Sequence, residues 1–122
     1  MTTKILIVDD EPPIILSLRF LMKQQGYETR EAADGLAALE EVEQFQPDLI
    51  LLDIAIPKLN GFEVCQRIRS NPDWQATKIV MLTARGRQEE IEKGLTLGAD
   101  LYITKPFSTR ELVAQVNELL AQ

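Results

Sequence analysis

The sequence contains no histidine, and its single cysteine, Cys65, has no partner for an internal disulfide. Without imidazoles or paired thiolates, the chain lacks the ligands that usually bind transition metals, whereas oxygen-bound hard cations remain compatible with it. Long apolar runs are also missing. The run Ile5–Val8 is far shorter than a membrane-spanning helix or the core of a signal peptide. We therefore expect a protein of the reducing cytoplasm with no membrane partner.

An excess of basic residues is missing as well. Lysine and arginine number 13 against 19 aspartate and glutamate residues, which gives a formal net charge of −6. Proteins that bind the nucleic-acid backbone need clustered positive charge, so we expect no direct nucleic-acid partner. Hydrophobic residues make up 45% of the chain, an ordinary fraction for a folded protein. At 122 residues, we expect one domain over residues 1–122 with a sizeable core.

Short runs of isoleucine, leucine and valine recur along the chain. Three of them are apolar at every residue rather than at every second one, which is typical of strands covered on both faces in a parallel sheet. Two weaker stretches predict strands that are more exposed to solvent. The strong runs are Ile5–Val8, Leu49–Leu52 and Ile79–Leu82, and the weaker stretches are Tyr27–Glu31 and Leu101–Thr104.

Helical patterns separate these runs, and several carry terminal signals. The first stops at Gly26, a residue that tolerates the left-handed conformation of a helix end, and the last begins with Ser108 and Glu111 in capping-box spacing. Five strands alternating with five helices predict a doubly wound α/β fold. The other three helices are expected from Asp34-Gly35 with an apolar stripe that includes Leu36, from Asn60-Gly61, and from about Arg87 to Gly98.

Polar residues follow four of the five predicted strands. In a doubly wound fold, ligands bind beyond the carboxyl ends of the strands, so these residues should meet at one edge of the sheet. Carboxylates, a hydroxyl and an ammonium group would then converge there. The residues are Asp9-Asp10-Glu11 after the first strand, Asp53 after the third, Thr83-Ala84 after the fourth and Lys105-Pro106 after the fifth.

Clustered carboxylates repel one another, and a divalent cation removes that conflict. Mg²⁺ suits the cluster best, because it takes one or two carboxylates and keeps waters and phosphate oxygens as further ligands. Lys105 could neutralise another phosphate oxygen, and Asp53 is a suitable nucleophile, since carboxylates form acyl phosphates. Taken singly, each residue has a simpler interpretation: Asp10 or Thr83 as a helix cap, Asp53 as a turn residue and Lys105 as a solvated side chain.

At this point the sequence resembles the receiver domain of two-component response regulators, over essentially its whole length. Each matching stretch is weak alone, and their order and spacing make the resemblance specific. It implies a flavodoxin-like sheet with strand order 2-1-3-4-5. The stretches are Ile5–Glu11, Asp48–Asp53, Pro57 with Asn60-Gly61, Met81–Ala84, Gly98–Asp100 and Lys105–Phe107.

The resemblance also implies a role for each site residue. Asp53 would accept a phosphoryl group from a histidine kinase or phosphotransfer protein, and the side chain of Lys105 would pair with the phosphate. The peptide bond between Lys105 and Pro106 would be cis. Thr83 would close on the phosphate while Tyr102 swings inward, which would signal to a downstream effector. The ligands of Mg²⁺ would be Asp10, Asp53, the backbone carbonyl of Ala55 and, through a water molecule, Asp9 of the acidic pocket.

The sequence departs from the family pattern at positions that tune its behaviour. Ala55 and Arg85 stand where the family adjusts the lifetime of the phosphate. Leu101 and Gln115 stand where winged-helix transcription factors place an acid and an arginine that pair two chains. A monomer and a phosphorylation-dependent homodimer therefore both stay open.

Two other functions fit the sequence less well. A Mg²⁺-dependent aspartyl-phosphate phosphatase usually has a second aspartate two residues after the nucleophile, where this chain has Ala55. A flavin electron carrier would need a phosphate-binding loop after the first strand, where the acidic run at Asp9 would repel the phosphate. A receiver acts only on its own aspartate, so we expect no enzyme in the usual sense.

The first predicted helix carries apolar residues away from its core stripe. At about 100° per residue, Leu16 and Phe20 lie opposite Leu18, and Ile15 lies at the border of the stripe. An exposed pair of this size is a candidate partner surface. The alternatives are scattered surface hydrophobes, an edge of the core covered by Phe20, or a homodimer contact. The apolar face of the third helix includes Cys65, which we expect to be a core thiol.

Overall fold

The structure, a computed structural model, describes residues 2–84, 92–93 and 95–122. In this part of the chain, five strands form one parallel sheet in the order β2-β1-β3-β4-β5, as predicted. The order reverses between β1 and β3, and ligands of doubly wound folds bind at such a point. The strands are β1 (Lys4–Val8), β2 (Glu28–Ala32), β3 (Leu49–Asp53), β4 (Lys78–Thr83) and β5 (Leu101–Thr104).

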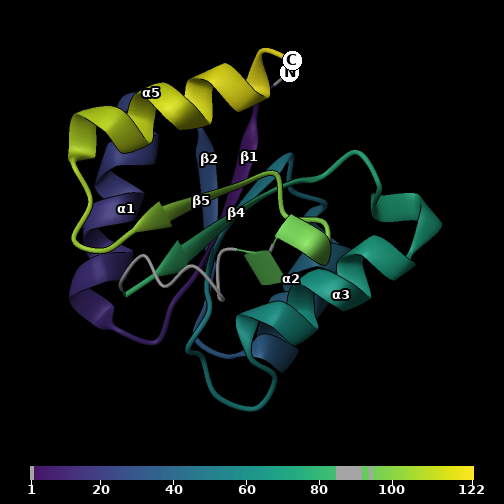
Figure 1. Ribbon diagram of the computed structural model, residues 1–122. Helices are drawn as coiled ribbons and strands as arrows, with labels where there is room; N and C mark the ends of the chain where they lie inside the picture. The colour runs from purple at the N-terminus through teal and green to yellow at the C-terminus, as the bar shows by residue number, and fades with distance from the viewer. Residues whose placement is uncertain (1, 85–91, 94) are drawn as a thin grey trace.

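Helices cover both faces of the sheet. Figure 1 shows α1 (Pro12–Gln24) and α5 (Thr109–Leu120) on one face, with α2 (Gly35–Phe45) and α3 (Gly61–Ser70) on the other. The described residues thus include four α-helices, against five predicted. Half of the remaining helix, expected from about Arg87 to Gly98, falls outside the described residues; within the other half, residues 92, 93, 95 and 96 are helical. None of the helices described here has the length and apolarity needed to span a bilayer.

Two apolar cores flank the sheet because the side chains of each strand point alternately to its two faces. Leu6, Val8, Ile50 and Leu52 pack toward α2 and α3, whereas the intervening residues of β1 and β3 pack toward α1 and α5. Full burial of an aliphatic side chain contributes roughly 1.5–3 kcal/mol, so these central strands are a major source of stability. The edge strand β2 buries only Ala32, which confirms the expected difference between strong and weak runs.

Local side-chain bonds fix the helix ends. Asn60 caps α3 by accepting a bond from the backbone N–H of Glu63, and the backbone N–H of Asn60 donates to the Glu63 carboxylate. The two residues thus form a capping box with the same spacing as Ser108 and Glu111. At α5, the Ser108 side chain accepts a bond from the backbone N–H of Glu111, which is one of the two bonds of the expected capping box. Gly26 ends α1 with a φ of 85°, also as expected.

The expected stripe of α2 was partly wrong. The helix buries Ala38, Val42 and Phe45 and leaves Leu36 48% exposed. A step of 100° per residue places Leu36 about 200° away from Ala38, on the side of the helix that faces solvent.

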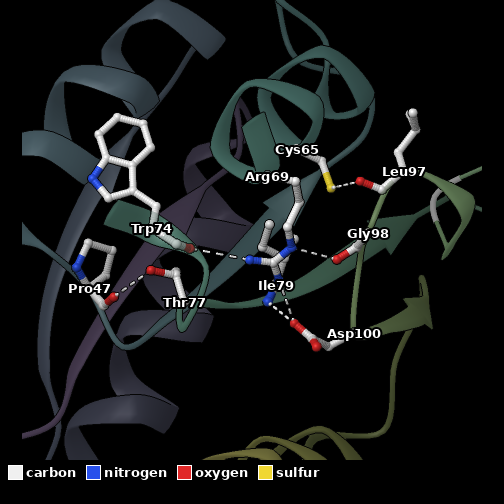
Figure 2. A network of polar contacts seen from close by, with 9 residues as sticks. All are labelled: Pro47, Cys65, Arg69, Trp74, Thr77, Ile79, Leu97, Gly98 and Asp100. Carbon is white, nitrogen blue, oxygen red and sulfur yellow. Dashed lines mark hydrogen bonds and ion pairs between the residues drawn. The ribbon is translucent and has the colours of Figure 1, made fainter. Parts of the chain in front are cut away.

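A polar network on α3 ties distant segments together (Figure 2). The guanidinium of Arg69 donates to the carbonyl oxygens of Gly98 at 2.8 Å and Trp74 at 3.4 Å, and pairs with Asp100 at 2.8 Å. The same carboxylate of Asp100 accepts a bond of 2.8 Å from the backbone of Ile79 at the start of β4. One arginine therefore joins α3 to the chain before β5 and, through Asp100, to β4.

Replacing Arg69 with methionine keeps an apolar stem but removes all three bonds. We expect a loss of about 2 kcal/mol of unfolding free energy in urea, since the pair is largely buried and the lost bonds are charge-assisted. Arg30→Met is the matched control, because Arg30 makes an ion pair of 3.3 Å with Glu41 while its side chain is 48% exposed. That variant should lose less than about 1 kcal/mol. Equal losses in the two variants would contradict this assignment.

Candidate functional site

Strand register brings the predicted site residues to one edge of the sheet. Val8 pairs with Leu52, so the next residues, Asp9 and Asp53, emerge side by side. Thr83 is the last residue of β4 and pairs with Thr104 of β5. Lys105 follows Thr104 directly, and its backbone N–H donates to the carbonyl oxygen of Thr83 at 2.6 Å. Four strand ends thus deliver the carboxylates, the hydroxyl and the ammonium to one place, as predicted.

The ammonium of Lys105 is the centre of this arrangement. Its nitrogen lies 2.8 Å from a carboxylate oxygen of Asp9, 3.6 Å from one of Asp53 and 3.7 Å from one of Glu11. The Lys105 side chain is only 13% exposed. The interpretation of this lysine as an ordinary solvated side chain is therefore wrong. The bond between Lys105 and Pro106 is cis, as the family resemblance implied.

Four carboxylates form a cluster at this edge. One oxygen each of Asp9, Asp10, Glu11 and Asp53 lies within 4.8 Å of the others. Asp9 and Asp53 are buried, whereas Asp10 and Glu11 are exposed. Glu11 was not among the predicted ligands, although its place in the acidic run was the signal that could have identified it. The cluster is therefore closed on the protein side and open to solvent on the other.

The exposed part of the cluster, Asp10 and Glu11, lies in the short turn between β1 and α1. The first helical residues are Pro12 and Pro13, which suit a helix start because their missing N–H groups would have no helical partner there. The N-terminal cap position belongs to Glu11, whose side chain makes no capping bond, and its backbone N–H donates to Asp9 at 2.9 Å. The reading of Asp10 as the cap of this helix is therefore wrong.

The segment after Asp53 is held by backbone bonds. The N–H of Ile54 donates to the carbonyl oxygen of Leu82, and the N–H of Gly61 donates to the carbonyl oxygen of Ile54 at 2.8 Å. The N–H of Ala55 approaches one carboxylate oxygen of Asp53 at 3.4 Å. Gly61 packs so closely that a Cβ atom there would lie 2.6 Å from the carbonyl oxygen of Asp53. The backbone around the carboxylate therefore has little room to shift.

Burial and charge both act on the ionisable groups of the site. Burial raises the pKa of Asp53 above its usual value, and the charges of Asp9 and Asp10 add to the rise, against the opposing effects of Lys105 and the Ala55 N–H. For Lys105, burial alone would lower the pKa. The hydrogen bond to Asp9 and the surrounding carboxylates outweigh it, so the pKa of the ammonium is raised and it stays charged.

The donor set fits a hard divalent cation. It consists of carboxylate oxygens that one ammonium group leaves incompletely neutralised, and it is open to solvent on the side of Asp10 and Glu11. Mg²⁺ usually keeps several water ligands, so an open site with a few carboxylates suits it. The site is therefore a cluster of acidic residues able to bind a metal ion.

The two predicted switch residues lie on the neighbouring strands β4 and β5, two register positions apart. Thr83 is buried at the end of β4, with 2% of its surface exposed. Tyr102 is half-buried on β5, where its register partner is Met81. It lines a surface hollow of about 290 Å³ that Phe107 and Gln115 also line. Arg85, the other residue expected near the phosphate, lies outside the described residues.

Comparison with known proteins identifies the class that this fold and site define. The chain matches the family model for the response regulator receiver domain over residues 5–117. It belongs to the response regulator receiver family.

Individual relatives agree with this assignment. The chain is 45% identical over 120 residues to the alkaline phosphatase synthesis transcriptional regulatory protein PhoP of Bacillus subtilis. The aligned region covers 98% of this chain and 49% of that protein. It thus spans about half the length of this relative. A response regulator structure from Chloroflexus aurantiacus has a TM-score of 0.95 with 35% identity and full coverage of both chains. The chemotaxis regulator CheY4 of Vibrio cholerae has a TM-score of 0.91 with 30% identity, covering 98% of this chain and 99% of that one. The predicted fold and family are confirmed.

The raised pKa of Asp53 gives a testable sign. The folded state holds the proton of the Asp53 carboxyl group more tightly than the unfolded chain does, so protonated Asp53 stabilises the fold. This stabilisation is lost as the pH rises through the folded-state pKa. Asp53→Asn should therefore have a higher melting temperature than the wild type at pH 7 without Mg²⁺. The gain should shrink as the pH falls toward the usual carboxyl range and when Mg²⁺ is added. Glu118→Gln, at an exposed carboxylate, is the control and should give no such gain; a gain at Asp53 that is independent of pH would contradict the assignment.

Proposed function

We propose that this receiver accepts a phosphoryl group on the carboxylate of Asp53. The observation that carries the proposal is the position of Asp53: it is buried at the end of β3, 3.6 Å from the Lys105 ammonium and beside three further carboxylates. Asp9 lies in the same cluster, but both of its carboxylate oxygens are closely bonded, one to the Lys105 ammonium at 2.8 Å and the other to the backbone N–H of Glu11 at 2.9 Å. The matching contacts of Asp53 are longer, at 3.6 and 3.4 Å, which favours Asp53 as the nucleophile. Family membership supports the same role.

The transfer itself needs little covalent chemistry from the protein. A carboxylate oxygen of Asp53 would attack the phosphorus atom of a phosphohistidine, forming a P–O bond while the P–N bond breaks. The electron pair of that bond leaves on the donor imidazole, which takes up a proton. Catalysis is then mainly positioning and neutralisation of charge. Lys105, already 3.6 Å from the attacking carboxylate, would accompany one oxygen of the transferred group.

Mg²⁺ would complete the site. Asp10, Asp53 and the backbone carbonyl of Ala55 would hold it directly, Asp9 would hold it through a water molecule, and Glu11 lies close enough to join them. When bound, it would neutralise part of the negative charge that an incoming phosphate meets. This ligand set is a proposal that the carboxylate geometry and the family support.

The phosphate would then act on the predicted switch. Thr83, at the neighbouring strand end, would close on the phosphate oxygens, and Tyr102 would leave the hollow beside Phe107 and turn inward. The altered surface would address a downstream effector protein. A monomer and a phosphorylation-dependent homodimer are both compatible with this output, and a direct nucleic-acid contact is not part of it.

The chain would act on its own aspartate rather than turn over a substrate. A phosphatase of this chemistry would need a general acid two residues after the nucleophile, and the exposed methyl group of Ala55 cannot supply one. Its only reactions would therefore be phosphoryl acceptance and its own dephosphorylation. The proposal covers one receiver domain over residues 1–122, located in the cytoplasm.

Phosphorylation with a small donor tests the proposal directly. Incubation with acetyl phosphate and Mg²⁺ should add the mass of one phosphoryl group, removable by hydroxylamine because the product is an acyl phosphate. Asp53→Asn should abolish the added mass, which intact-protein mass spectrometry measures. The acidic-cluster variant Asp10→Asn keeps the nucleophile and should label more slowly while requiring more Mg²⁺. Full labelling of Asp53→Asn would place the phosphate elsewhere.

The donor protein would dock on α1, whose first turn lies beside the acidic cluster. Leu16 and Phe20 are 60% and 62% exposed, as predicted, and their helix begins two residues after Asp10. Ile15 is half-buried against the core shared with α5 and contributes less. Helix-on-helix docking commonly relies on a few apolar anchors of this kind.

The double change Leu16→Ser with Phe20→Ser should slow transfer from the cognate phosphohistidine protein at least about tenfold, the effect of losing roughly 1.4 kcal/mol of contact. Labelling by acetyl phosphate and the melting temperature should stay nearly unchanged, because both side chains are largely exposed. The control is Leu36→Ser, which removes an exposed leucine from α2 in the opposite layer. Transfer at the wild-type rate in the double variant would remove the docking proposal.

A further inference from the structure

The segment between β3 and α3 is pressed against the start of α2. This segment, residues 54–60, carries Ala55 two residues beyond Asp53. Its middle meets α2 through a backbone bond of 3.1 Å, in which the N–H of Gly35 donates to the carbonyl oxygen of Pro57. Two elements distant in the sequence thus share a backbone contact beside the site.

Gly35 is needed at this contact because the two backbones approach too closely for a side chain. A Cβ atom at Gly35 would lie 2.1 Å from the carbonyl oxygen of Leu59 and 2.5 Å from its Cβ atom. Both distances are shorter than any tolerable contact, and the first obstacle is backbone, which cannot rotate away. Gly26 is a useful contrast: it has a φ of 85°, but a Cβ atom there would meet nothing within 4 Å.

An ion pair accompanies the backbone contact but is the weaker part of it. Lys58 lies 3.5 Å from a carboxylate oxygen of Asp34, the residue that caps α2 through its bond of 2.7 Å from Ala37. The Lys58 side chain is 60% exposed, and such surface pairs contribute about 0–1 kcal/mol. The close approach at Gly35, rather than the charge pair, therefore sets the position of the segment.

The rest of the segment is anchored at both ends. At its start, Ile54 is bonded to β4 and to Gly61. The side chains of Ile54 and Ile56 are buried in the core under α2 and α3, and Leu59 packs against the same core. Ala55 is exposed between these anchors. Because the Ala55 side chain packs against neither core of the described residues, the position of the Ala55 carbonyl group depends on the backbone on either side of it.

We propose that Gly35 is a positioning residue for the cation site: its close approach to Leu59 fixes residues 54–59, and with them the backbone carbonyl of Ala55. This inference rests on the proposed function, in which that carbonyl is a ligand of Mg²⁺. A side chain at residue 35 would push the segment away from α2 and displace the carbonyl relative to Asp10 and Asp53. Gly35 itself touches neither the cation nor the phosphate.

The test compares Gly35→Ala with Gly26→Ala. Both changes should lower the melting temperature, the first through the clash and the second through the positive φ. Calorimetric titration with MgCl₂, well below both melting temperatures, should show about tenfold weaker binding for Gly35→Ala, the usual effect of disturbing a residue that supports a ligand. Gly26→Ala should bind Mg²⁺ as the wild type does.

Phosphorylation by acetyl phosphate gives a second readout. In Gly35→Ala, the Mg²⁺ concentration for half-maximal rate should rise about tenfold, and saturating Mg²⁺ should restore most of the maximal rate. If Gly35→Ala does not fold, Leu59→Gly loosens the same contact from the other side and should weaken Mg²⁺ binding in the same direction.

The outcomes separate the two proposals. Wild-type binding of Mg²⁺ by Gly35→Ala, or by Leu59→Gly where that variant replaces it, overturns the positioning role and leaves the proposed function intact. A wild type that neither binds Mg²⁺ nor labels at Asp53 overturns the proposed function, and the positioning role with it.

Discussion

The ammonium of Lys105, enclosed by Asp9, Asp53 and Glu11, is the interaction on which the functional edge of this protein depends. Two buried carboxylates side by side are unfavourable without a compensating charge, and the lysine supplies one at 2.8 Å from Asp9. One positive charge does not balance four carboxylates, however. The remaining negative charge faces solvent, where a divalent cation can reach it. In the proposed function, this arrangement of charges, which costs stability in the isolated protein, would become the basis of metal and phosphate chemistry.

The rest of the fold holds that arrangement still. The central strands β1 and β3 are buried on both faces, so the positions of Asp9 and Asp53 are set by the rigid part of the molecule. Further contacts hold the connecting segments. The close approach at Gly35 supports the segment between β3 and α3, and the Arg69 network supports the segment before β5 at the opposite end of the sheet. The apolar cores that stabilise the fold are thus separate from the site at the strand ends, and the backbone of the strands connects the two.

Much of this could be predicted from local patterns. Fully apolar runs indicated strands covered on both faces, because only a sheet between two helical layers buries every side chain of a strand. The acidic residues and Lys105 could be assigned to one edge, because parallel strands end together. Local patterns failed where packing decides, since Leu36 fitted an apolar stripe yet is exposed. Glu11 could have been identified from its place in the acidic run, but its contact of 3.7 Å with Lys105 is visible only in the structure.

The sequence by itself determined the order of strands and helices, the family and which ionisable residue types follow the strand ends, because these depend on periodicity, composition and spacing along the chain. Only the tertiary structure decided which groups are buried and which charges touch. It paired Lys105 most closely with Asp9, left Asp10 open to solvent and brought Leu59 against Gly35. Such contacts join residues far apart in the chain, and their distances follow from the packing of two layers on a sheet, which no local pattern encodes.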